Sequence, residues 1–157
     1  MADPKSGYIT QTDDQSCGPV AILNALNWLR RNPSQRPGLA RLRRECGTGT
    51  TGSPFGQVRE TVFRHLRPKA AVVLRHNPDF REIVRRLDEG QAMIFRWKHP
   101  WCEGGHMAFA YRGDRRGIRI VNGGHPGQPA VHQMSGSTMR RLLRRRFSFA
   151  FFIRRRI

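Results

Sequence analysis

The sequence predicts an α+β fold in which N-terminal helices pack on an antiparallel sheet built mainly from the C-terminal half. Two observations support this prediction. Apolar residues recur at helical spacing over residues 18–31, 56–66 and 80–90, and short apolar segments separated by turn signals follow from residue 91 onward. Helices and strands that are segregated along the chain are typical of the α+β class.

The first predicted helix begins at Gly18 and continues to about Arg31, where Asn32-Pro33 ends it. It is apolar around most of its circumference, so we expect it to be central. A short helical segment, LARLRRECG, follows within a stretch rich in Pro, Gly, Ser and Thr, and a second full helix begins near Gly56. AAVVL, from Ala70, is a predicted strand.

Residues 77–79, Asn-Pro-Asp, are a helix start signal, and Gly90 is the matching stop. Strands are then predicted in QAMIFRW, HMAFAYR and GIRIVNG, with a hairpin turn between the last two at residues 113–117. We expect a loop over residues 123–137. A short basic helix, STMRRLLRRR, follows with Ser135 or Ser137 as its cap, and FSFAFFI is the final strand.

The length of 157 residues suits a single domain spanning residues 1–157, with a basic tail from about residue 154. No apolar run approaches the roughly 20 residues that cross a bilayer, and the N-terminal segment lacks the apolar core of a signal peptide. Three cysteines cannot all pair with one another, which favours reduced thiols. A cytoplasmic protein with no membrane span is the prediction.

The formal net charge is +18, from 29 basic and 11 acidic residues. Such a charge attracts polyanions, whether nucleic acid, anionic lipid or an acidic protein. Arginine runs at 140–146 and 154–156 flank Phe147, Phe149, Phe151 and Phe152, which suggests a basic aromatic surface. The alternative is that the charge lies on solvated faces and that the alternating phenylalanines belong to a buried strand.

Cys17 is the first candidate for a catalytic residue, because it stands where the central helix would begin, in the stretch QTDDQSCGPVA. The N–H groups and dipole of a helix N-terminus favour a thiolate, which is the nucleophilic form. The competing interpretation is that Cys17 is a small buried apolar residue, as most free cysteines are.

His106 and Asn122 are candidates for the partners of Cys17. His106 opens a predicted strand, and Asn122 ends the next one, sixteen residues later. A hairpin that turns near residues 113–117 brings these strand ends together, so Asn122 can hold the His106 ring by a hydrogen bond. Each residue also has an ordinary role: His106 as one of six histidines, and Asn122-Gly123 as a turn dipeptide.

Gln11 lies six residues before Cys17, and its amide could stabilise an oxyanion together with the Cys17 main-chain N–H. Gln15 is the rival donor, and either side chain could instead be a polar loop residue. Together, these residues comprise a nucleophile, a base, an orienting group and an oxyanion donor, which is what thiol acyl transfer requires.

A metal site built from His99, Cys102, His106 and His125 is a weaker alternative. The ligand pairs typical of zinc fingers are missing from this spacing, and His106 cannot serve as ligand and base at once. We therefore expect no metal and no cofactor.

These motifs resemble the papain-like cysteine peptidases, and most closely the bacteriocin-processing, double-glycine leader peptidases and their free-standing relatives. The similarity rests on Gln11, Cys17-Gly18 with its apolar helix, and the segment GGHMAFAYRGDRRGIRIVNGG. It implies a papain-like fold with Cys17 as nucleophile, His106 as base, Asn122 as orienting residue and Gln11 as oxyanion donor. Leader peptidases commonly carry Asp-Pro where this chain has Asn122-Gly123.

The predicted function is therefore a cysteine peptidase that cleaves a peptide or amide bond of a protein or peptide substrate through an acyl-enzyme. The net charge favours an acidic substrate. Three alternatives remain open at this stage. One is a deamidase or transglutaminase-like enzyme, the second is a nucleic-acid- or polyanion-binding protein, and the third is an inactive scaffold on the same fold. Neither the substrate nor the oligomeric state follows from the sequence.

Overall fold

Five α-helices and a six-stranded antiparallel sheet make up the described part of the chain, which covers residues 7–29, 32–98, 105–122, 130–144 and 148–156 of a computed structural model. The helices are α1 (Cys17–Trp28), α2 (Leu39–Glu45), α3 (Phe55–Leu66), α4 (Phe80–Asp88) and α5 (Gly136–Arg144), with a 3₁₀ turn at Pro33–Gln35. The strands are β1 (Ala70–His76), β2 (Ala92–Trp97), β3 (His106–Asp114), β4 (Gly117–Val121), β5 (Val131–Ser135) and β6 (Phe149–Arg155).

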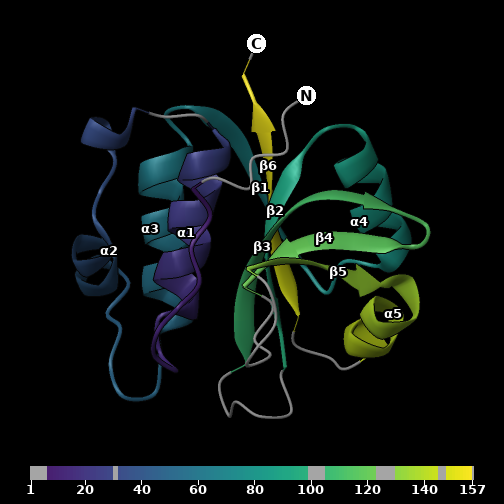
Figure 1. Cartoon of the computed structure of the whole chain (residues 1–157), viewed down its shortest axis with the longest axis horizontal. Coiled ribbons are helices and arrows are strands. Elements are labelled where there is room, and N and C mark those ends of the chain that lie inside the picture. Colours follow the sequence, from purple (N-terminus) through teal and green to yellow (C-terminus); the bar gives the residue numbers. More distant parts are fainter. Residues whose placement is uncertain (1–6, 30–31, 99–104, 123–129, 145–147, 157) are drawn as a thin grey trace.

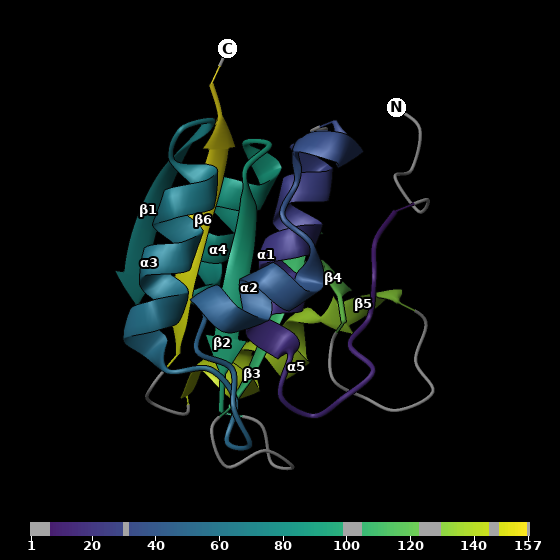
Figure 2. The same ribbon diagram turned by 90° about the vertical axis from the view of Figure 1, so that its left-hand side faces the viewer.

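The helices form two layers, one on each face of the sheet. Helices α1, α2 and α3 cover one face, and α4 and α5 cover the other (Figures 1 and 2). Two separate clusters of buried apolar side chains fill the spaces between the sheet and these layers. The predicted α+β class, with N-terminal helices packed on an antiparallel sheet, is confirmed.

The strand order is β1-β6-β2-β3-β4-β5, so the last strand of the chain lies inside the sheet. Strand β6 pairs with β1 on one side and with β2 on the other. Its residues alternate between the two cores: Phe149 and Phe151 face the α1 layer, and Phe152 faces the α4 layer. The phenylalanines of FSFAFFI that are described are therefore core residues, and the suggestion that they form an exposed stacking surface is wrong.

The start and stop signals predicted for α4 behave as expected. The Asp79 carboxylate accepts a hydrogen bond from the Glu82 N–H at 2.7 Å, which satisfies one of the free donors of the first turn. Gly90 follows the helix with a φ of 81°, a left-handed conformation that glycine adopts without steric cost.

The predicted loop at 123–137 is wrong in its second half, because β5 pairs with β4 along Val131–Ser135. This strand lies at the sheet edge and is only partly buried, so its sequence VHQMS lacks the apolar alternation that signals a strand. Two boundaries also differ from the prediction. Helix α1 ends at Trp28, and β6 continues to Arg155, into the basic tail. Of the two proposed caps for α5, Ser135 accepts the Thr138 N–H.

Strand β3 is packed from both sides, by α1 on one face and by α4 on the other. An ideal Cβ placed on Gly18, in the first turn of α1, would lie 3.7 Å from the Sδ atom of Met107, the second residue of β3. The start of α1 therefore lies against the start of β3. This packing sets the N-terminal ends of both elements, where Cys17 and His106 occur, at the same end of the molecule.

Candidate active site

Cys17 is the first residue of α1 and is partly exposed, whereas Gly18, Pro19 and Val20 behind it are buried. The apolar body of the helix thus anchors it in the core, and the thiol is left at its N-terminal end. The N–H groups of a first helical turn have no intrahelical acceptors, and no acidic residue lies within this turn. Such an end favours a negatively charged sulfur.

Cys46 provides the contrast. It lies at the C-terminal end of α2 and is completely buried in the core under α1. Burial raises the pKa of the Cys46 thiol to about 11, and the nearby Glu45 carboxylate adds to the increase, although a hydrogen bond with Thr61 opposes it. Cys46 is therefore a protonated, inaccessible thiol. Cys102 lies outside the described residues.

Asn122 follows β4 in a left-handed conformation, with φ 60°, and every hydrogen-bonding group it has is engaged. Its N–H donates to the Ala130 carbonyl at 2.9 Å, and its carbonyl oxygen lies 2.6 Å from His106 Nε2. Its side-chain Nδ2 donates to Gln11 Oε1 at 2.7 Å, and its Oδ1 accepts from the Gln11 N–H at 3.3 Å. Asn122 thus joins the His106 strand to the Gln11 segment.

His106 is held by the main chain of Asn122, not by its side chain. A carbonyl oxygen can only accept a hydrogen bond, so Nε2 carries the proton and Nδ1 carries the lone pair in the neutral ring. His106 also makes an edge contact with the Trp97 ring, with centroids 5.2 Å apart, and only 3% of its surface is exposed. The hydrogen bond to Asn122 and the packing against Trp97 both restrict the orientation of the ring.

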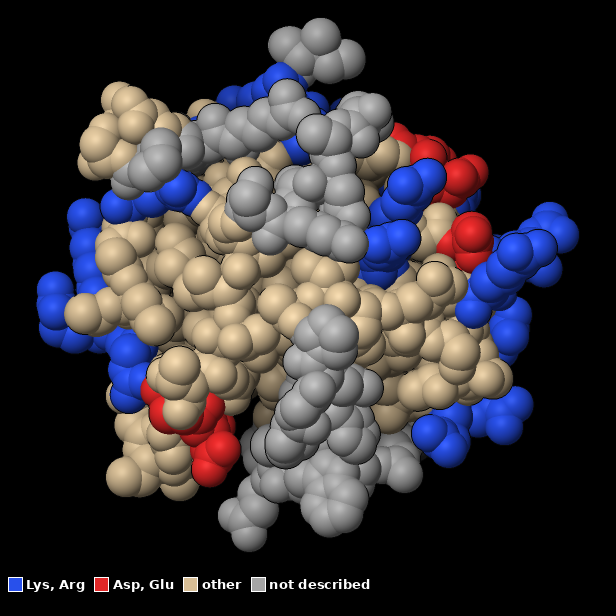
Figure 3. All heavy atoms as spheres, in the orientation of Figure 1, with Lys and Arg blue, Asp and Glu red and all other residues tan. Residues whose placement is uncertain are grey.

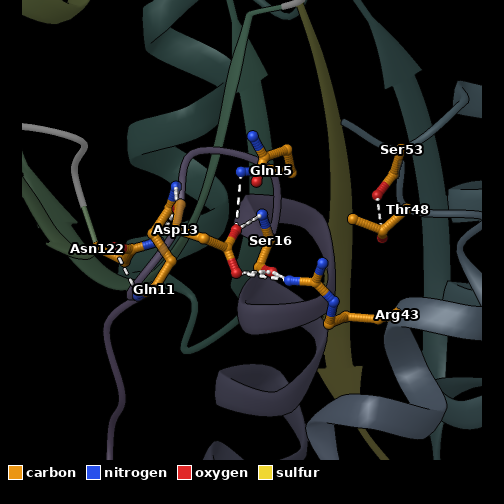
Figure 4. A network of polar contacts seen from close by, with 8 residues as sticks. All are labelled: Gln11, Asp13, Gln15, Ser16, Arg43, Thr48, Ser53 and Asn122. Carbon is orange, nitrogen blue, oxygen red and sulfur yellow. Dashed lines mark hydrogen bonds and ion pairs between the residues drawn. The ribbon is translucent and has the colours of Figure 1, made fainter. Parts of the chain in front are cut away.

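The predicted hydrogen bond between His106 and Asn122 is present, but through a different atom from the one the sequence suggested. The side chain of Asn122 instead pairs with Gln11 (Figure 4). Gln11 Nε2 donates in turn to the Asp13 carbonyl at 2.8 Å. An amide nitrogen has two hydrogens, so one of them remains for a further acceptor.

The loop between Gln11 and Cys17 is organised by Asp13, a residue that the sequence analysis did not single out. Its Oδ1 accepts the N–H groups of Gln15 and Ser16, both at 2.8 Å, and its Oδ2 accepts the Ser16 hydroxyl at 2.8 Å. Arg43 of α2 also donates to Oδ2, at 2.5 Å, next to the Ser16 hydroxyl (Figure 4). Asp followed three residues later by Ser before an apolar helix is a signal that could have revealed this turn.

Burial alone would raise the pKa of Asp13. The hydrogen bonds from Ser16 and Gln15, together with the Arg43 charge, outweigh that effect and hold the pKa of this carboxyl below its usual range. Asp13 is therefore ionised wherever the fold is intact at neutral pH. Gln15, the rival oxyanion donor, contributes its main-chain N–H to this turn.

The rest of the described structure contains a hollow of moderate size and no metal-ligand cluster. A hollow of about 490 Å³ lies at the turn between β3 and β4, lined in part by Arg112, Asp114, Arg119 and Gln133, at the opposite end of β3 from His106. No group of three or more His, Cys, Asp or Glu side chains suited to a metal occurs among the described residues. His99, Cys102 and His125 of the alternative metal site fall outside them. None of the described helices is long and apolar enough to cross a membrane.

The sequence matches no protein-family model and no curated protein. Solved structures nevertheless share its architecture. The peptidase domain of Streptococcus ComA, a bifunctional ABC transporter of a quorum-sensing pathway, superposes with a TM-score of 0.66 at 16% identity, covering 94% of this chain and 97% of that one. This chain has the fold of that peptidase domain. Two further solved structures share the same fold.

A double-glycine motif protease from an AMS/PCAT transporter, solved in complex with the leader peptide, gives a TM-score of 0.62 at 12% identity, over 93% of this chain and 89% of that one. A protein from Bacillus anthracis described as a C39-like peptidase gives 0.67 at 10% identity, over 98% of each chain. The papain-like fold predicted from the Gln-Cys and His-Asn motifs is therefore confirmed.

Proposed function

We propose that this chain is a papain-like cysteine peptidase, a thiol hydrolase that cleaves a peptide bond through an acyl-enzyme. The observation that carries the proposal is the bond from His106 Nε2 to the Asn122 carbonyl. It leaves Nδ1 as the basic nitrogen of an oriented imidazole, at the end of the fold where α1 presents Cys17. The shared fold with peptidase domains supports this choice of reaction.

In the proposed reaction, His106 Nδ1 takes the Cys17 proton and the resulting thiolate attacks the substrate carbonyl carbon. The carbon–nitrogen bond breaks as the His106 imidazolium gives that proton to the leaving amine, and a thioester remains. Water then attacks the thioester, His106 accepts a proton from it, and the carbon–sulfur bond breaks to restore the thiol. Asn122 keeps the imidazole in the required tautomer through its main-chain carbonyl.

Two donors are proposed for the oxyanion. One is the Cys17 N–H, in the first turn of α1. The other is the second hydrogen of Gln11 Nε2, since the first is used by the Asp13 carbonyl. Donors that are fixed before the reaction stabilise developing charge more effectively than donors that must reorient.

The substrate proposed is a peptide, since one neighbouring structure is a protease bound to its leader peptide. The net charge of +18 favours an acidic peptide. Figure 3 shows Lys and Arg side chains around the margins of one face, with a mostly uncharged centre. Attraction of this kind weakens with salt, so KM for an acidic peptide should rise as ionic strength increases, and kcat should change little.

The other functions considered gain no comparable support. The structures that share the fold are described as proteases or peptidases, which does not favour a deamidase or a transglutaminase-like enzyme. The buried positions of Phe149, Phe151 and Phe152 remove the aromatic part of the nucleic-acid hypothesis.

The test is to incubate the protein with a proteome-derived peptide library and to identify new termini by mass spectrometry. We expect cleavages that disappear in Cys17→Ala and in His106→Gln and that persist in His65→Gln, a histidine of α3 paired with Glu45 of α2. Cleavage that survives Cys17→Ala, or new termini that also appear without the protein, would rule out the proposed nucleophile.

A further inference from the structure

Arg43 connects α2 to the loop that precedes Cys17. Its NH1 nitrogen lies 2.5 Å from Asp13 Oδ2 and also donates to the Ser16 hydroxyl. Asp13 and Ser16 are also bonded to each other, so the side chains of Asp13, Ser16 and Arg43 form one closed group of hydrogen bonds (Figure 4). These contacts join residues that are about thirty positions apart in the sequence.

Asp13, the residue that Arg43 holds, contacts the chain on both sides of the loop. Its main-chain carbonyl accepts Gln11 Nε2, and its carboxylate accepts the N–H groups of Gln15 and Ser16 just before the helix. The proposed oxyanion donor and the start of the nucleophile helix are therefore both fixed to one residue. Movement of Asp13 would disturb both of them together.

This arrangement also creates an electrostatic conflict. The Asp13 carboxylate accepts the N–H of Ser16, the residue immediately before Cys17, so a thiolate at Cys17 would form one residue away from an existing negative charge. At an effective dielectric constant of about 20, two like charges about 7 Å apart repel each other by about 2 kcal/mol. The Arg43 cation, which is bonded both to this carboxylate and to the Ser16 hydroxyl, offsets that repulsion.

The other titratable and charged groups around the thiol do not replace Arg43. Asp14 is exposed in the same loop, and Cys46 lies in the core on the α2 side. His106, on β3, is the proposed base and so changes its charge during the reaction. Arg43 is the basic residue that is hydrogen-bonded to this loop at Asp13 and Ser16.

We propose that Arg43 is a positioning residue for the reaction: it neutralises and anchors Asp13, so that Asp13 can hold Gln11 and the residues just before α1 without suppressing the Cys17 thiolate. This inference rests on the proposed function and adds a residue to its machinery. Arg43 acts through Asp13.

The experiment measures the rate at which iodoacetamide alkylates Cys17, resolved from the other cysteines by peptide mapping, from about pH 5 to about pH 9. Arg43→Met should move the midpoint of this pH profile upward by about one unit, which makes alkylation roughly tenfold slower below the midpoint. Arg43→Lys keeps the charge and should stay within about twofold of the parent. Arg44→Met, at the exposed neighbouring position, is the matched control and should leave the profile unchanged.

A second variant separates charge from scaffolding. Asp13→Asn can still accept the Gln15 and Ser16 N–H groups but carries no charge. The double variant Asp13→Asn with Arg43→Met should therefore regain most of the rate that Arg43→Met loses, at a similar Tm. If the double variant is as slow as Arg43→Met, the electrostatic account is wrong.

The outcomes also distinguish this inference from the proposed function. If Cys17 in the parent protein reacts no faster than Cys46, the proposed nucleophile fails. If Cys17 is reactive and Arg43→Met alkylates at the parent rate, only the role of Arg43 fails. Because Arg43 and Asp13 are each about one-third exposed, we expect all these variants to fold. Should Arg43→Met not fold, Arg43→Gln carries the same prediction.

Discussion

Replacing Asn122 tests whether its side chain serves Gln11 or His106. Asn122→Ala removes two hydrogen bonds, one to Gln11 Oε1 and one from the Gln11 N–H. Each is worth about 1 kcal/mol when partly buried. Alanine also has to adopt the left-handed φ of 60°, which costs about 1 kcal/mol more than it does for asparagine. The free energy of unfolding should therefore fall by about 3 kcal/mol.

Two further variants divide this loss into its parts. Asn122→Gly loses the same hydrogen bonds but not the backbone strain, so it should be more stable than Asn122→Ala by about 1 kcal/mol. Gln11→Ala removes the partner of Asn122 Nδ2, and a double-mutant cycle between the two positions should give a coupling energy of about 1 kcal/mol. Urea unfolding followed by tryptophan fluorescence measures all of these values.

The same variants test which part of Asn122 orients the His106 ring. Since His106 Nε2 is held by the main-chain carbonyl of Asn122, the pH midpoint of Cys17 alkylation should change little in Asn122→Gly. Additive effects of Asn122→Ala and Gln11→Ala on the free energy of unfolding would refute the contact described between Asn122 and Gln11. Equal stability of Asn122→Ala and Asn122→Gly would refute the left-handed conformation of Asn122. A large shift of the alkylation midpoint in Asn122→Gly would instead indicate that the side chain orients His106.

Three other predictions follow from single observations. Native-state alkylation should modify Cys17 at least about tenfold faster than Cys46, whose burial raises its pKa to about 11; comparable rates would contradict this. The pKa of Asp13 is lowered on folding, so its contribution to stability is complete above the unfolded value of about 3.9 and is lost as pH falls through the folded value. Asp13→Asn should therefore flatten the acid side of the stability–pH curve measured by thermal melts, and an unchanged acid limb would show that the carboxylate is not involved. Gly105→Ala should lower Tm, because its φ is 83° and the new Cβ would lie 2.7 Å from the Trp97 carbonyl oxygen, whereas Gly56→Ala in the open first turn of α3 should leave Tm unchanged or slightly raise it. Equal melting temperatures for the two alanine variants would contradict that reasoning.

Local signals in the sequence were enough to predict most of the fold. Helix α1 follows from its apolar periodicity, α4 from Asp79 and Gly90 at its ends, and β2, β3 and β6 from apolar runs too short to be helices. Strand β5 was missed because a half-buried edge strand does not need apolar alternation; its pairing with β4 decides its conformation.

The candidate site was likewise predicted only in part from the sequence. The spacing between His106 and Asn122 sufficed to predict that they meet, because a tight hairpin leaves few alternatives for the two strand ends. Which atom of Asn122 would face the ring was not predictable. That depends on the left-handed turn after β4 and on Gln11, which lies 111 residues away in the sequence.

By itself, the sequence determined the α+β class, the position of Cys17 at a helix start and the pairing of His106 with Asn122, since each depends on residues close together along the chain. The tertiary structure alone decided the contacts that cross between elements. Arg43 reaches Asp13 only because α2 packs beside α1, and Asn122 meets Gln11 only because the loop before α1 crosses the end of β4. Such contacts leave no periodic trace in the sequence, because they depend on how the layers pack and not on local conformational preference.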